Sequence, residues 1–129
     1  MITLKTVMRA NAASCIIFAL IFLLNPAATA AFLGGEIPAP DLVFLILGAV
    51  LMFNGLHLMW VSSNPMPNKL WVLYFSFGDF LWVIATAVLL ILGIWITTGI
   101  GIIASMVVAI VVGTFGVLQM MKRKAMGCC

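Results

Sequence analysis

Charge is the scarcest property of this sequence. Lysine and arginine number six, aspartate and glutamate number three, and together they make up 7% of the 129 residues. A soluble domain carries about 25% charged residues, so this scarcity excludes an ordinary soluble globular domain. A disordered chain is also excluded, because 66% of the residues are hydrophobic and the net charge is only +3.

Histidine and cysteine are also scarce, and their shortage excludes several kinds of chemistry. The single histidine, His57, cannot form a bis-histidine haem site or a histidine-rich metal site within one chain. The zinc motif His-Glu-x-x-His, a phosphate-binding loop and the nucleophile motif Gly-x-Ser-x-Gly are all missing. We therefore expect a protein that is not an enzyme and has no catalytic residues, metal or cofactor. Six cations are also too few to suggest nucleic-acid binding.

Long uncharged runs are what the sequence has in abundance. A bilayer core about 30 Å thick requires roughly 20 apolar residues in one helix. Residues 10–35 carry no charge, residues 42–68 hold only His57, and residues 70–121 hold only Asp79. The last run is long enough for two helices. The sequence thus predicts an all-α polytopic membrane protein with four spans, near residues 10–33, 42–63, 70–95 and 98–121.

The connections and the basic residues predict how these spans are arranged. Short loops make consecutive helices antiparallel neighbours, which indicates an up-down-up-down four-transmembrane-helix bundle forming one domain over residues 1–129. The basic residues lie before the first span, between the second and third spans, or after the fourth: Lys5, Arg9, Lys69, Lys122, Arg123 and Lys124. The positive-inside rule then predicts a multi-pass protein of the cell inner membrane, N-in/C-in, with both termini cytoplasmic.

One feature interrupts the first span. Proline lacks an amide N–H and its ring crowds the preceding turn, so Pro26 can kink the helix after Asn25. The basic start, the apolar run and the sequence Ala28-Thr29-Ala30 are also typical of a signal peptide with a cleavage site. We interpret the segment as an uncleaved first span.

Asp79 is the most informative residue, because it is a carboxylic acid near the middle of the bilayer. It lies ten residues past Lys69, or roughly 15 Å along a helix. An ionised aspartate at that depth costs at least about 2.5–3.5 kcal/mol, so the group must be neutral, paired or hydrated. On a helix, Ser76 shares a face with Asp79, and Trp82 adjoins it.

The second span supplies two further polar side chains at a matching depth. Asn54 lies nine residues before Ser63, and His57 lies one helical turn away on the same face. If the second and third spans pack side by side, Asn54 and His57 come to lie opposite Asp79. The candidate ligand or proton site therefore comprises five residues: Asp79, His57, Asn54, Trp82 and Ser76.

This predicted polar site has three interpretations. In the first, Asp79 is protonated or hydrogen-bonded to Asn54, His57 and Trp82, and it fixes the register of the helices. In the second, Asp79 takes up and releases a proton with His57 as a relay, because intramembrane carboxylates often mark proton or ion paths. In the third, the site binds a lipid headgroup, a quinone or another small ligand.

The fourth span carries a stripe of small residues. Four such residues recur at four-residue spacing: Gly101, Ser105, Ala109 and Gly113. Small side chains let helix backbones approach closely in lipid. The stripe fits packing inside the bundle, and it also fits a contact with a second copy of the chain.

Several short motifs carry a resemblance to a known group of proteins. They are Arg9-x-Asn11 at the start of the first span, Asn25-Pro26 late in it, Asp79-x-x-Trp82 in the third span, and Gln119 at the end of the fourth. With these motifs the chain resembles small four-span bacterial inner-membrane proteins of uncharacterised function. The resemblance implies a four-span fold and no activity.

Two functional hypotheses follow from these patterns. The first is a small integral membrane protein that acts as a structural or accessory helix-packing partner in the lipid bilayer, within a homo-oligomer or a larger membrane complex. The second is an oligomeric, proton-linked small transporter or channel that uses Asp79 and His57.

Overall fold

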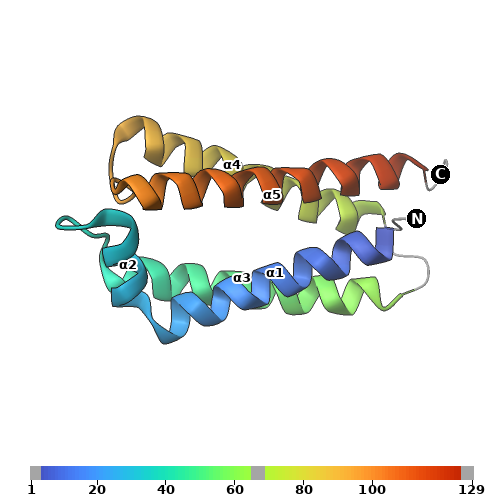
Figure 1. Ribbon diagram of the computed structural model, residues 1–129. Helices are drawn as coiled ribbons and strands as arrows, with labels where there is room; N and C mark the ends of the chain where they lie inside the picture. The colour runs from blue at the N-terminus through green and yellow to red at the C-terminus, as the bar shows by residue number, and fades with distance from the viewer. Residues whose placement is uncertain (1–3, 65–68, 126–129) are drawn as a thin grey trace.

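Five helices make up the part of the chain that the structure describes. The structure is a computed structural model, and it describes residues 4–64 and 69–125. The helices are α1 (Leu4–Leu24), α2 (Pro26–Gly34), α3 (Asp41–Ser62), α4 (Lys69–Leu92) and α5 (Gly99–Ala125) (Figure 1). Four of these helices are long and apolar enough to cross a membrane, which confirms the predicted all-α bundle with four spans: Leu4–Leu24, Asp41–Ser62, Leu70–Leu92 and Gly99–Lys122.

The first span differs from its predicted bounds. The helix α1 begins at Leu4 and ends at Leu24, and the chain continues in the separate short helix α2. Pro26 occupies the first turn of α2, where its missing N–H leaves no hydrogen bond unmade. Asn25 lies between the two helices, outside helical geometry, with φ −137° and ψ 56°. The expected kink is therefore a full break, and α2 runs across the end of the bundle (Figure 1).

The spans form two antiparallel pairs, α1 with α3 and α4 with α5 (Figure 1). These pairs meet mainly through α1 and α5, rather than through α3 and α4, which are consecutive in the sequence. The backbones of α3 and α4 approach less closely, and these two helices pack through side chains: Leu58 and Val61 of α3 lie with Val72 and Phe75 of α4 in one core cluster. Both α1 and α4 begin, and α5 ends, at the end of the bundle that is opposite to α2 (Figure 1).

Two glycines of α3 explain why α1 is its partner. A Cβ added to Gly55 would lie 2.7 Å from the Ile16 side chain and 3.1 Å from the Ala12 carbonyl oxygen. A Cβ added to Gly48 would lie 3.2 Å from the carbonyl oxygen of Ala19. Close backbone approach through small residues is the usual basis of helix association in lipid.

The C-terminal end of α2 is held by the loop before α5. The backbone N–H groups of Thr97 and Thr98 donate to the Leu33 carbonyl at 2.8 and 3.1 Å, and the Thr98 hydroxyl donates to the Phe32 carbonyl at 2.7 Å. The last carbonyls of a helix have no partner within the helix, and a hydrocarbon surrounding cannot supply one. The loop satisfies these carbonyls and joins α2 to the α4–α5 pair.

Candidate functional site

A buried polar cluster joins three of the four spans. The Asp79 Oδ2 atom accepts hydrogen bonds from Asn11 Nδ2 of α1 at 2.9 Å and from Gln119 Nε2 of α5 at 3.0 Å. Asn11, Asp79 and Gln119 are only 1%, 4% and 0% exposed. The carboxyl group is therefore shielded from the surroundings and held by donors from two neighbouring helices.

Further hydrogen bonds connect the amide and hydroxyl groups of this cluster. Asn11 Nδ2 also donates to Gln119 Oε1 at 3.1 Å, and Gln119 Nε2 also donates to Ser76 Oγ at 3.4 Å. The Ser76 hydroxyl donates to the Gly116 carbonyl at 3.3 Å. Each side-chain amide thus uses both of its N–H donors inside the protein, as burial in an apolar surrounding requires.

Asn54 is connected to Asp79 only indirectly, through a chain of hydrogen bonds. Asn54 Nδ2 donates to Cys15 Sγ at 3.5 Å, and Cys15 Sγ donates to Asn11 Oδ1 at 3.7 Å. The helix α3 therefore enters the cluster through α1, because α1 lies against α3 and supplies the residues nearest to Asp79.

His57 lies in a separate aromatic cluster. Its ring centroid is 4.6 Å from that of Trp71 and 5.1 Å from that of Phe75, and Phe53, Trp60 and Tyr74 lie farther out. Within residues 4–64 and 69–125, the buried His57 Nδ1 atom has no hydrogen-bond partner. The structure does not bring His57 to Asp79, because Asn11 of α1 occupies the position that we expected α3 to fill.

Trp82 lies one helical turn after Asp79 but takes no part in the hydrogen bonds of Asp79 that the structure describes. Its indole ring packs nearly parallel to Phe22, with centroids 6.5 Å apart and planes at 12°. Of the five predicted site residues, the structure therefore unites Asp79 and Ser76, places Asn54 at the edge, and puts His57 and Trp82 elsewhere.

Asn11 and Gln119 are central to the cluster, yet the predicted site leaves them out. Both are polar residues within apolar runs, which is a usable signal. The start of the first span hid the role of Asn11, because a helix from residue 10 places it at the membrane edge. Since α1 begins at Leu4, Asn11 lies seven residues into the helix, or about 10 Å.

The small-residue stripe of α5 makes contacts within the chain. A Cβ added to Gly101 would lie 3.0 Å from Leu33 Cα of α2, and one added to Gly113 would lie 3.4 Å from the Val83 side chain of α4. Ser105 lines a pocket, and Ala109 is half-buried. These positions support the interpretation of the stripe as internal packing.

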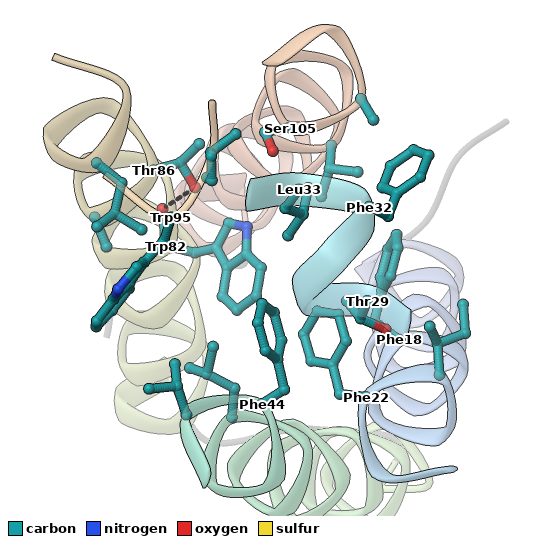
Figure 2. Close-up of a pocket in the computed structure, with 18 of the residues that line it drawn as sticks. Phe18, Phe22, Thr29, Phe32, Leu33, Phe44, Trp82, Thr86, Trp95 and Ser105 are labelled. Atoms are coloured by element: carbon teal, nitrogen blue, oxygen red, sulfur yellow. Dashed lines mark hydrogen bonds between the residues drawn. The ribbon is translucent and has the colours of Figure 1, made fainter. Parts of the chain in front are cut away.

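The pocket lies at the α2 end of the bundle and has a volume of about 780 Å³. Figure 2 shows Phe18, Phe22, Phe44 and Trp82 around it, with α2 passing over one side. Neither Asp79 nor His57 is among its lining residues. The described part of the chain therefore has two separate features, a compact polar cluster and an apolar pocket.

The polar cluster offers little reactive chemistry. No group of three His, Cys, Asp or Glu side chains within the described ranges 4–64 and 69–125 could hold a metal ion. Asp79 accepts hydrogen bonds from amides, which neither activate a nucleophile nor relay a proton at neutral pH. The arrangement is suited to joining helices.

Comparisons with protein-family models, with curated proteins and with solved structures found no match. The structure supports four candidate spans, and no family or homologue is identified.

Proposed function

We propose that this small polytopic membrane protein is a non-enzymatic structural or accessory partner in the bilayer, and that the polar cluster around Asp79 fastens its spans together. The observation that carries the proposal is the pair of hydrogen bonds from Asn11 and Gln119 to the shielded oxygen of Asp79. A carboxyl group satisfied in this way has a structural task.

The energetics of a lipid surrounding support this assignment. Apolar side chains gain little by leaving lipid for one another, so packing and interhelical hydrogen bonds hold membrane helices together. Such a bond contributes about 0.6 kcal/mol on average and about 1.7 kcal/mol at most. A buried polar group that loses its partner costs more, which makes the cluster specific for one register of α1, α4 and α5.

The competing hypothesis is proton-linked transport by Asp79 and His57. A transport pathway needs a relay beside the carboxyl group and a passage through which protons reach it. His57 is surrounded by aromatic rings, and the described pocket does not include Asp79. These observations favour the structural role over the transport role.

The orientation and the partner belong to the same proposal. Lys5, Arg9 and Lys122 lie at the end where α1 begins and α5 ends, and the positive-inside rule assigns that end to the cytoplasm. The lipid-facing surface of the spans would contact either a second copy of the chain or a larger complex of the cell inner membrane.

Co-purification of the full chain in mild detergent, after cross-linking in cells, tests this function. We expect the wild type and Asp79→Asn to recover the same membrane partner, because asparagine retains an oxygen that accepts both amide donors. A chain that purifies alone in every case would contradict an accessory role. Loss of the partner in Asp79→Asn alone would show that the charge of Asp79, and not its hydrogen bonding, matters.

A further inference from the structure

The pocket at the α2 end has the dimensions of a binding site. Its volume of about 780 Å³ falls within the range of roughly 300–1,000 Å³ that small-molecule sites occupy. Protein interiors are packed as densely as organic crystals, and voids larger than a water molecule are few. This pocket is partly open to its surroundings, so a molecule dissolved in the bilayer can enter it.

The walls of the pocket select an uncharged ligand with a flat ring. Among the described residues that line it none is charged, and six are aromatic: Phe18, Phe22, Phe32, Phe44, Trp82 and Trp95. Phe22 packs against Phe44 edge-on at 5.3 Å and against Trp82 nearly parallel at 6.5 Å. Aromatic faces and edges of this kind attract other ring systems beyond simple area burial.

Several side-chain hydrogen-bond donors on the wall have no partner among the residues that the structure describes. Within the described part of the chain, the indole N–H groups of Trp82 and Trp95, the Ser105 hydroxyl and the Asn25 amide make no hydrogen bond, and Trp82 is the one that lies deepest from the end of its helix. The other wall hydroxyls are bonded within their helices, since Thr29 donates to the Asn25 carbonyl and Thr86 to the Trp82 carbonyl. An unsatisfied donor in hydrocarbon is costly, so these free donors favour a ligand that brings an acceptor.

The depth of Trp82 limits which molecule can bring that acceptor. Trp82 lies ten residues before the end of α4 at Leu92, or about 15 Å, which is half of a hydrocarbon core about 30 Å thick. Phospholipid oxygens lie in the polar interface outside that core and do not reach this level. The acceptor must belong to a molecule that dissolves in the core itself.

We propose that this pocket binds a lipid-soluble quinone, a flat uncharged ring whose carbonyl oxygens accept hydrogen bonds from Trp82 and Ser105. The ring contacts the aromatic walls, and the hydrocarbon tail lies among the aliphatic side chains that complete the lining. The proposal concerns binding only, and it is independent of the role of the Asp79 cluster.

Tryptophan fluorescence tests the proposal. The full chain with Trp60, Trp71 and Trp95 replaced by phenylalanine retains Trp82 as its single indole. In nanodiscs, a short-tailed benzoquinone should quench Trp82 along a saturating curve. The matched control retains Trp60 alone, which lies outside the pocket lining and should show only quenching proportional to the quinone dissolved in the bilayer. Equal, non-saturating quenching of both indoles would overturn the proposal.

Direct binding to the otherwise unaltered chain gives a second measurement. Equilibrium dialysis in detergent with the same benzoquinone should show one site. The change Ala85→Leu fills the pocket wall and should abolish binding, whereas Ala87→Leu, on the same helix but outside the lining, should leave it unchanged. Trp82→Phe keeps a ring but removes the donor and should weaken binding about fivefold, as expected for one lost hydrogen bond.

Two further results would count against a quinone. Equal binding by Ala85→Leu and Ala87→Leu would place the benzoquinone outside this pocket. Quenching of Trp82 by phospholipids with brominated acyl chains, without competition from the benzoquinone, would identify a phospholipid tail as the occupant.

Discussion

Asn11 of α1 donates a hydrogen bond to Gln119 of α5, across 108 residues of sequence, and the same two side chains donate to one oxygen of Asp79. These three hydrogen bonds join the first span, α1, and the last span, α5, to each other and to Asp79 of the third span, α4. They connect the two helix pairs through α1 and α5, whose backbones make the closest approach between the pairs.

A double-mutant cycle on Asn11 and Gln119 should detect this coupling. We expect Asn11→Leu and Gln119→Met each to destabilise the fold, and the double variant to lose less than the sum. The expected coupling is about 0.6 kcal/mol and at most about 1.7 kcal/mol, the range of hydrogen bonds between membrane helices. Reversible unfolding in mixed micelles measures the free energies.

The matched control is a second cycle that mutates Asn25 in place of Asn11. Asn25 is exposed, and its side chain makes no capping hydrogen bond. Asn25→Leu and Gln119→Met should be additive. Additivity in the Asn11 cycle as well would contradict the described contact.

Gly55 should be far less tolerant of a side chain than Gly78. The change Gly55→Ala introduces a methyl group 2.7 Å from the Ile16 side chain and 3.1 Å from a backbone oxygen, so α1 and α3 must separate. We expect a loss of about 1–3 kcal/mol in the free energy of unfolding, as for other overpacked positions.

Gly78→Ala is the control for this change, because no described atom outside the adjoining backbone of its own helix lies within 4 Å of the added methyl group. It should leave stability unchanged or raise it by up to about 1 kcal/mol through better helix propensity. Equal stability of the two variants would be incompatible with the close α1–α3 contact.

Thr98 should control the order of α2. Its hydroxyl donates to the Phe32 carbonyl and accepts from the Gly101 amide, so Thr98→Val frees a donor and an acceptor next to helix ends. We expect faster hydrogen exchange in α2 and at Gly101, equivalent to about 1 kcal/mol of lost protection. Thr114→Val is the control, since that hydroxyl bonds only to Ile110 in its own helix. Identical hydrogen exchange in both variants would show that the hydrogen bonds of Thr98 do not hold α2 in place.

The proposed orientation predicts opposite labelling of two exposed loop positions. Glu36 follows α2 and Ser63 follows α3, so the two lie on different sides of the bundle. In intact bacterial cells, and with the three native cysteines replaced by serine, a membrane-impermeant thiol reagent should label Glu36→Cys at once and Ser63→Cys only after lysis. Labelling of Ser63→Cys in intact cells would reverse the orientation.

The sequence predicts the architecture of this protein better than its polar contacts. Uncharged runs are long relative to the bilayer, so four spans follow from composition and helix geometry alone. The partner of Asp79 depends on which helices are neighbours. Gly48 and Gly55 decide that α1 packs against α3, and their role becomes clear only when the structure places them against the Ala19 and Ala12 backbone.

The length of the first helix carries a similar lesson. Arg9 and Lys5 suggested a span beginning at residue 10, but both are exposed at the end of α1, where long basic side chains extend toward water. That shift moves Asn11 inward and makes it the residue that meets Asp79. The pocket depends on the break at Asn25, which turns α2 across the bundle (Figure 1).

Unfolding of Asp79→Asn beside Asp79→Leu in the same mixed micelles is the most direct test of a structural Asp79. Asparagine keeps an accepting oxygen, whereas leucine leaves Asn11 and Gln119 with donors that face no acceptor. We predict that Asp79→Asn unfolds like the wild type and that Asp79→Leu loses about 1–3 kcal/mol. Equal stability of all three proteins would contradict the account, because the hydrogen bonds to Asp79 would then hold nothing together.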